Sequence, residues 1–268
     1  MRVKKVININ SQFRKNFFTS NSNDFKVSLN YELRDVVSMK LLNVQIPNTW
    51  YNISNEIGNN KFIIDSDTYI IPDGNYDSES LIDKIKGLKS DNGIRFYDAS
   101  GFPTKADILV DADSGKAIFY SAYDVPMTVS FSTFGDLDER NLNTFGWTMG
   151  FRKANYTSIV SCASEGIINL GGFNYMYLVV DDNNTHSSDL VIGNLKDTYI
   201  SDNILGIIRV NASNFVIVNK DDYDFPRRDY TSPVKIREFR VKMLDPNGTL
   251  INFNYMDYSF SIEFEILI

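Results

Sequence analysis

Cysteine and histidine are almost absent from this chain, which contains one of each in 268 residues. The single cysteine, Cys162, cannot close an internal disulfide, and its place in an apparent strand predicts a small buried residue. Zinc sites need several His or Cys ligands, so the sequence predicts no zinc site. The one histidine, His186, lies in a polar stretch. It is a poor candidate for a Ser-His-Asp triad, which needs a histidine held by packing.

Long apolar runs and glycine-rich phosphate loops are also missing. No stretch approaches the roughly 20 apolar residues of a membrane-spanning helix. The first residues, Met-Arg-Val-Lys-Lys-Val, contain no apolar core of signal-peptide length. We therefore expect a soluble chain made in a reducing compartment, with no catalytic centre, no cofactor and no small-molecule substrate.

Acidic residues are plentiful, and they leave two other kinds of site open. They gather in two clusters, Asp136, Asp138 and Glu139 in one and Asp221, Asp222 and Asp224 in the other. Paired carboxylates hydrolyse glycosides, and carboxylate oxygens bind calcium. The second cluster lacks the glycine and the terminal glutamate of a helix-loop-helix calcium loop. We interpret both clusters as solvated loops.

Charge is unevenly distributed along the chain. Residues 1–23 carry a net charge of +5 and contain no acidic residue. The whole chain carries a net charge of −7, so the remaining residues carry −12. The negative total argues against general nucleic-acid binding. We interpret residues 1–24 as an extended arm that contacts a partner, and a solvated tail without a role is the alternative. The predicted interaction residues of this arm are Arg2, Lys4, Lys5, Phe13, Arg14, Lys15, Phe17 and Phe18.

The stretch Val36–Ile53 predicts a long central strand. Its apolar phase changes at Leu41-Leu42, which indicates a bulge or burial on both faces. Pro47 should end the strand because proline has no N–H for the ladder. Further strands are predicted at 25–29, 62–64, 69–71, 94–97, 108–110, 117–120, 127–131, 159–162, 176–180, 204–209, 215–218, 236–244, 250–253 and 258–268.

Helical signals are few. Asp77 or Ser78 can cap a helix whose apolar stripe is Leu81, Ile82, Ile85 and Leu88, with Gly87 near its end. A second short helix is predicted over 136–143. Two glycines among aromatics, in Phe145-Gly-Trp147 and Gly150-Phe151, predict a tight backbone corner packed on the core.

Many short strands with one or two short helices predict an all-β fold. We expect an antiparallel β-sandwich of jelly-roll type. The predicted organisation is the arm at 1–24 followed by one domain at 25–268, with a subdivision near 135–150 as an alternative. The polar residues 181–203 predict a long surface loop.

Five stretches carry a family resemblance through their order along the chain. They are Asn8–Leu29; Val36–Ile53 with Val44-Gln-Ile-Pro-Asn-Thr-Trp-Tyr51; Ile71-Pro-Asp-Gly-Asn-Tyr76 followed by Leu81-Ile82 and Ile85; Phe145-Gly-Trp147 with Gly150-Phe151; and Asp245-Pro-Asn-Gly248. Together they resemble the minor capsid proteins of large nucleocytoplasmic DNA viruses, the giant viruses. The chain is too short for the double jelly roll of a major capsid protein, which leaves a minor or penton role.

The resemblance implies a structural virion protein made in the host cytoplasm. Its partners would be major capsid proteins and other minor capsid proteins in an icosahedral shell. Self-association and contact with an inner membrane are further expectations, and the arm would tie neighbouring subunits together.

Two other functions stay open at this point. A carbohydrate- or receptor-binding β-sandwich, such as a fibre head, is suggested by Tyr223, Tyr230 and Tyr255 in loops beside Asp and Asn. A glycosidase on the same scaffold is the other, because one fold hosts many functions.

Overall fold

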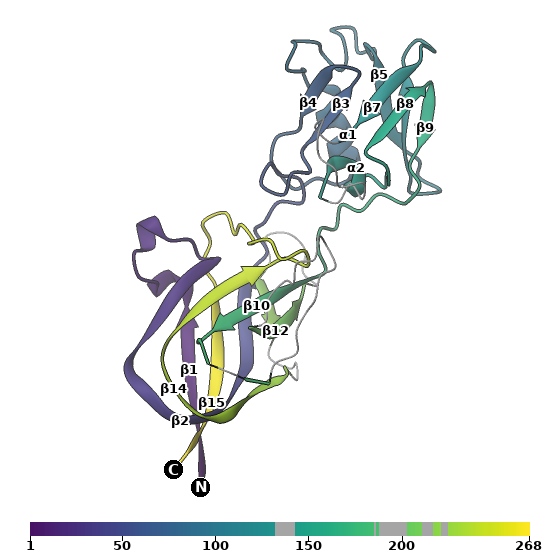
Figure 1. The fold of residues 1–268 in the computed structure, drawn as a ribbon. Helices are drawn as coiled ribbons and strands as arrows, with labels where there is room; N and C mark the ends of the chain where they lie inside the picture. The colour runs from purple at the N-terminus through teal and green to yellow at the C-terminus, as the bar shows by residue number, and fades with distance from the viewer. Residues whose placement is uncertain (132–142, 185, 188–202, 211–216, 221–224) are drawn as a thin grey trace. The chain divides into compact units, whose positions relative to one another are not determined.

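A computed structural model of the chain describes residues 1–131, 143–184, 186–187, 203–210, 217–220 and 225–268. The chain forms two compact units (Figure 1). Unit 1 contains Met1–Trp50 and Phe173–Ile268, and unit 2 contains Tyr51–Gly172. This division differs from the predicted arm at 1–24 and single domain at 25–268. The inserted unit escaped prediction because both units are rich in strands, so the composition does not change at Trp50 or at Phe173.

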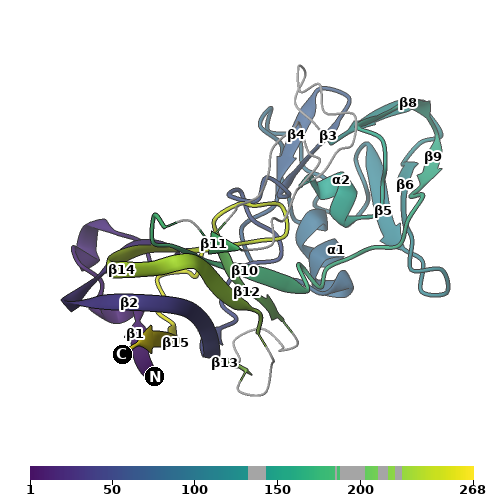
Figure 2. The same cartoon turned by 60° about the horizontal axis from the view of Figure 1, so that its bottom comes forward.

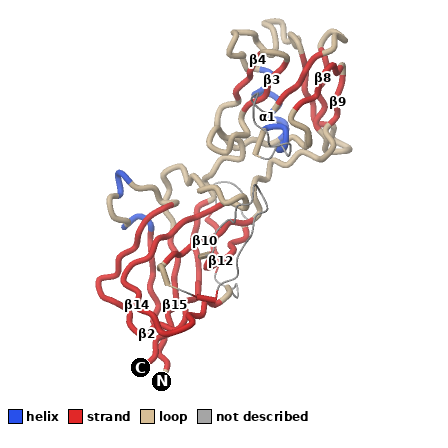
Figure 3. The backbone as a smooth tube through the Cα atoms, viewed as in Figure 1, coloured by secondary structure: helices blue, strands red, loops and turns tan. Residues whose placement is uncertain are grey.

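Unit 1 is built on one antiparallel sheet of eight strands in the order β1-β15-β2-β14-β10-β12, with β11 pairing to β14 and β13 to β2. Its strands are β1 (Arg2–Asn10), β2 (Asp24–Pro47), β10 (Tyr175–Asp181), β11 (His186–Ser187), β12 (Ile204–Arg209), β13 (Ile217–Lys220), β14 (Arg227–Leu244) and β15 (Ser259–Leu267). Figure 3 shows that strands dominate this unit.

The long strand β2 confirms the predicted central strand. It lies between β15 and β14 and ends at Pro47. Ser261 of β15 pairs with Asn43 and Ile262 pairs with Leu41, so Leu42 is the extra residue of a bulge at the predicted place. The strand also extends back to Asp24 and absorbs the strand predicted at 25–29. Asp35 has a φ of 58° within it, and the pairing of β2 with β14 shifts register nearby. Figure 2 shows the two strands curving side by side.

Nine residues near the start of the predicted arm belong to the sheet. All residues from Arg2 to Asn10 pair with β15, and the two ends of the chain lie together (Figure 1), where the Met1 amino group donates to the Ile268 carbonyl at 3.2 Å. The signal was present in Ile7 and Ile9, which alternate with Asn8 and Asn10, but the basic residues before them obscured it. Two 3₁₀ turns follow, at Ser11–Phe13 and Phe17–Thr19.

Strand β15 shows why the alternating pattern is informative. Phe260, Ile262 and Phe264 are at most 1% exposed, whereas Glu263 and Glu265 are half-buried and pair with cations of β1. Burying each large apolar side chain contributes on the order of 1.5–3 kcal/mol. The predicted strand at 258–268 is therefore confirmed, and its inner face contributes directly to the core of unit 1.

Unit 2 contains two small antiparallel sheets and two helices. One sheet has the order β4-β3-β7-β8 and the other β5-β6-β9. The elements are β3 (Lys61–Ile64), β4 (Asp67–Ile70), α1 (Ser78–Lys86), β5 (Ala106–Val110), β6 (Ala117–Ser121), β7 (Met127–Ser130), α2 (Phe145–Thr148), β8 (Asn155–Ile159) and β9 (Ser161–Ala163).

Helix α1 forms as predicted. The Asp77 side chain accepts from the Ser80 backbone N–H at 2.8 Å, and the Ser80 hydroxyl accepts from the Asp77 N–H at 3.0 Å, which completes a capping box. Leu81 and Ile85 are fully buried. Since so short a helix is marginal alone, its stability comes from this apolar stripe.

The core of unit 2 is aromatic. Phe62 lies at its centre, with ring centroids 5.3 Å from Tyr69 and from Phe145. The predicted corner is confirmed at Gly150, whose φ is +89° and where an added Cβ would lie 2.3 Å from the Gly166 carbonyl oxygen. Only glycine fits such a position. Phe145-Gly-Trp147 itself forms the single-turn helix α2.

The predicted fold class is confirmed, because the structure is mostly antiparallel β with two short helices. The strand predicted at 94–97 does not form; Arg95 and Tyr97 make only isolated bridges. The same is true of the strand predicted at 250–253, where Leu250 makes one bridge to Leu244. The helix predicted at 136–143 lies outside the described residues except for Asn143, which is in a turn. In the described part of the chain, no helix is long and apolar enough to cross a membrane.

Candidate interaction surface

The eight predicted interaction residues fall in two different settings. Arg2, Lys4 and Lys5 lie on β1, within the sheet of unit 1. The other five lie in the segment of residues 11–23 between β1 and β2, which we call the aromatic loop. These five are Phe13, Arg14, Lys15, Phe17 and Phe18.

The charges on β1 are used within unit 1. Arg2 pairs with Glu265 at 3.2 Å and Lys4 with Glu263 at 3.0 Å, both across the β1–β15 pairing. Both cations are largely exposed, so each pair contributes on the order of 0–1 kcal/mol. Both side chains are therefore already paired within unit 1, where they add little to its stability.

Arg14 is a structural residue of the aromatic loop. Its guanidinium pairs with Asp257 at 2.6 Å and is only 9% exposed. It also donates to the backbone carbonyls of Ser11 at 2.9 Å and Ser20 at 3.1 Å. The planar guanidinium has five N–H donors, so one arginine side chain can hydrogen-bond to several backbone turns at once. We predicted Arg14 as a partner contact, and the structure places it as the internal anchor of the loop.

The anchor extends to Ser11, which is fully buried. The Ser11 hydroxyl donates to Asp257 at 2.6 Å and accepts from the Tyr258 N–H at 3.0 Å. The Ser11 N–H donates to the Tyr258 carbonyl at 2.9 Å. Asp257 and Tyr258, which directly precede β15, therefore hold the start of the aromatic loop in place.

The phenylalanines of the loop remain exposed despite this order. Phe13 is 82% exposed, Phe18 is 96% exposed and Phe17 is 39% exposed. Phe17 packs under the Arg14 guanidinium, 4.2 Å from its ring centroid, and Phe18 meets the Phe17 ring edge-on at 5.4 Å. Large apolar side chains held out on an ordered segment are typical of a contact surface.

Lys5 and Lys15 face β2. The Lys5 ammonium lies 4.0 Å from the centroid of the Tyr31 ring. The Lys15 ammonium donates to the Ser28 hydroxyl at 3.0 Å. Neither interaction neutralises the charge, so both lysines keep a full positive charge on this side of unit 1.

Of the three tyrosines proposed for ligand recognition, only one is shown on the surface. Tyr255 is fully exposed. Tyr230 is buried and its hydroxyl donates to Asp182, which corrects its predicted loop position. Burial, with the Asp182 charge next, raises the pKa of Tyr230 above its ordinary value. Tyr223 lies outside the described residues.

Other tyrosine–carboxylate pairs serve packing in the same way. In unit 2, the Tyr156 hydroxyl donates to Glu165 at 2.6 Å, and burial together with this bond raises the pKa of Tyr156 to about 12. Tyr120 donates to Asp107 at 2.5 Å. Each pair satisfies a partly buried hydroxyl, as buried polar groups require.

His186 and Cys162, the two residues weighed for metal or catalytic chemistry, belong to different units. The backbone of His186 pairs with Tyr230 in β11, so part of the predicted loop is a short strand. Cys162 is half-buried in β9. Both acidic clusters, at 136–139 and 221–224, fall outside the described residues. Within those that are described, no three metal-ligating side chains come together.

The stretches that carried the family resemblance occupy defined places. The stretch Val44–Tyr51 contains the last residues of β2. It also contains the boundary between unit 1 and unit 2, which lies between Trp50 and Tyr51. The Asp245–Gly248 stretch is a turn closed by the Gly248 N–H to the Asp245 carbonyl at 3.0 Å.

The similarity of this chain to known proteins lies in its structure. No protein-family model matches the chain, and no curated protein matches it. Among solved structures, the chain is similar to the crystal structure of a mavirus penton protein at 9% sequence identity, with 99% of each chain covered and a TM-score of 0.46. Similarity at this level does not by itself establish a shared function.

Proposed function

We propose that this chain is a structural component of a virion, a minor capsid protein that packs with major capsid proteins in an icosahedral shell. The aromatic loop contacts a neighbouring subunit in this arrangement. The observation that carries the proposal is the pair of exposed rings, Phe13 and Phe18, on a loop that Arg14 anchors to Asp257. A preformed apolar contact loses little conformational entropy on binding, which favours stable assembly.

The sequence resemblance supports the same proposal from a different direction. It implies a capsid role through the order of five stretches that span both units. Antiparallel sheets are a suitable scaffold for such a role, since they leave edges and loops for lateral contacts while the core stays rigid.

The structure changes how this proposal is tested. Deleting residues 1–23 would remove β1 and uncover the edge of β15, so a failure to assemble would report on folding rather than on contact. Substituting Phe13→Ser and Phe18→Ser together is sharper, because both side chains are exposed and their loss leaves the core unchanged. Phe102→Ser is the matched control, an exposed phenylalanine of unit 2.

The first measurement is mass spectrometry of purified particles against infected-cell lysate. We expect the chain to be enriched in the particles, and its absence from them would reject the capsid role. The second is incorporation of the variants. Incorporation should fall for the double Phe13 and Phe18 variant and stay normal for the Phe102 variant. Normal incorporation of both would reject the contact role of the loop and leave the capsid role standing.

A further inference from the structure

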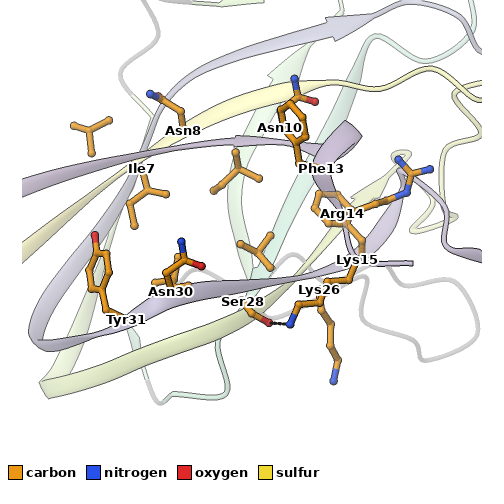
Figure 4. A pocket seen from close by; sticks show the side chains of 15 residues that line it. Ile7, Asn8, Asn10, Phe13, Arg14, Lys15, Lys26, Ser28, Asn30 and Tyr31 are labelled. Atoms are coloured by element: carbon orange, nitrogen blue, oxygen red, sulfur yellow. Dashed lines mark hydrogen bonds between the residues drawn. The ribbon is translucent and has the colours of Figure 1, made fainter. Parts of the chain in front are cut away.

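A groove runs along unit 1 between β1 and the first part of β2 (Figure 4) and has a volume of about 610 Å³. β1 pairs with β15 on one side. Residues 24–28 of β2 pair with β14 on one side. Among the described strands, none pairs with the opposite edge of either segment. The groove is therefore bounded by two strand edges that have free backbone donors and acceptors.

The floor of the groove is apolar and alternates with a polar rim. Ile7 of β1 and Val27 and Leu29 of β2 are half-buried against the core of unit 1. The next residue on each strand, Asn8 and Ser28, is polar and also lines the groove; Figure 4 shows Asn8 on the side of β1 opposite to Ile7. Because side chains alternate along a strand, a segment that enters between these edges must also alternate, with apolar residues pointing to the floor.

The rim is positively charged. Lys15 and Lys26 line the groove and are exposed, and neither makes an ion pair within the described structure. Lys5 adds a third charge above Tyr31, which also lines the groove. No acidic residue lines it. An occupant that carries carboxylates at its outward positions would match this rim.

The opposite edge of β1 shows that such a pairing forms in this protein. β15 alternates Ile262, Phe264 and Ile266 with Glu263 and Glu265, and the two glutamates meet Lys4 and Arg2 of β1. Strand β1 therefore already accepts an apolar–acidic strand on one side through backbone bonds and charge pairs.

We propose that the groove binds an extended acidic segment of a partner protein, which adds a strand between β1 and β2. Its apolar side chains rest on Ile7, Val27 and Leu29, and the carboxylates between them face Lys15 and Lys26. Strand addition of this kind takes affinity from backbone hydrogen bonds and specificity from the alternate side chains. The inference goes beyond the capsid role and does not depend on it, because it rests on the groove alone.

The test uses the full chain and a fluorescein-labelled peptide that alternates valine with glutamate. Fluorescence anisotropy should show binding of this peptide and not of the same peptide with lysine in place of glutamate. Reversing both rim charges, with Lys15→Glu and Lys26→Glu, should weaken binding about tenfold or more. The control is Lys235→Glu, an exposed lysine of β14 outside the groove, which should leave binding unchanged.

Hydrogen–deuterium exchange then locates the peptide. We expect slower exchange of backbone amides in residues 2–10 and 25–31 when the peptide is bound, because a new strand would protect both edges. Since all three substituted lysines are exposed, thermal melts should show that the variants stay folded.

Several results would overturn the proposal. These are no binding of the glutamate peptide, equal binding of the lysine peptide, equal weakening by the Lys235 variant, or binding that protects neither strand. Concentration-dependent self-association that protects the same amides without peptide would also overturn it, because a second copy would then be the occupant.

Discussion

The anchor of the aromatic loop allows a quantitative prediction about stability. Replacing Arg14 with glutamine keeps a polar side chain of similar length but removes the charge. The ion pair with Asp257 at 2.6 Å and the bonds to the Ser11 and Ser20 carbonyls would be lost or weakened. The Ser11 hydroxyl would still donate to Asp257, so that carboxylate keeps one protein partner.

The magnitude follows from the burial of the two partners. Removing one member of a fully buried ion pair costs about 3–5 kcal/mol, and an exposed pair contributes about 0–1 kcal/mol. The Arg14 side chain is 9% exposed and that of Asp257 is 22% exposed, so water reaches the remaining carboxylate in part. We expect Arg14→Gln to lower the free energy of unfolding of unit 1 by about 2–3 kcal/mol, between these limits.

The assay is urea denaturation followed by a probe in unit 1, such as the fluorescence of Trp50, which stacks on Phe173 at 4.9 Å. Trp147 in unit 2 would be replaced by phenylalanine to isolate this signal. The control is Arg34→Gln, whose arginine is 71% exposed and pairs with nearby Glu32; it should cost about 0.5 kcal/mol or less. If the two variants lose the same free energy, the assignment of Arg14 as an anchor is wrong.

Three further predictions concern unit 2. Gly150→Ala should destabilise unit 2 by at least about 2 kcal/mol in thermal or urea unfolding, since the new Cβ would overlap the Gly166 carbonyl at a φ of +89°; an unchanged midpoint would contradict the geometry. Burial raises the pKa of Asp67, but hydrogen bonds, chiefly from Lys105, outweigh it and hold that pKa below its ordinary value of 3.8. The ionised form therefore stabilises the fold above that value, and this contribution is lost as the pH falls through the lower pKa of the folded state. Asp67→Asn should thus melt at a lower temperature than the wild type near neutral pH, with the gap closing in acid; a constant gap would refute this. Burial, with a smaller effect of the Glu165 charge, raises the pKa of the Cys162 thiol above its ordinary value. At mildly alkaline pH, iodoacetamide should therefore alkylate this thiol more slowly in the folded chain than in the urea-unfolded chain. Equal rates would show that the fold does not protect the thiol.

Local patterns in the sequence were enough to predict individual elements. The strict alternation before Ile266 defined β15, and the capping residue Asp77 with the Leu81 and Ile85 stripe defined α1. The phase change at Leu41-Leu42 located the bulge, and Pro47 marked the end of β2. These signals are readable because they depend on backbone geometry and on which face of one element is buried.

The tertiary structure decided which elements are neighbours and which charges are free. Alternation indicates that a strand has a buried face, but any strand with a matching face can pair with it, so nothing local showed that β1 lies on β15 at the far end of the chain. That pairing determines the candidate surface. It pairs Arg2 and Lys4 with glutamates, makes the first part of the predicted arm an edge strand and brings Arg14 to Asp257. The sequence thus determined the strands and the positive charge of this region, whereas long-range pairing decided that Phe13, Phe18 and the groove beside β1 form the surface that we propose for partner binding.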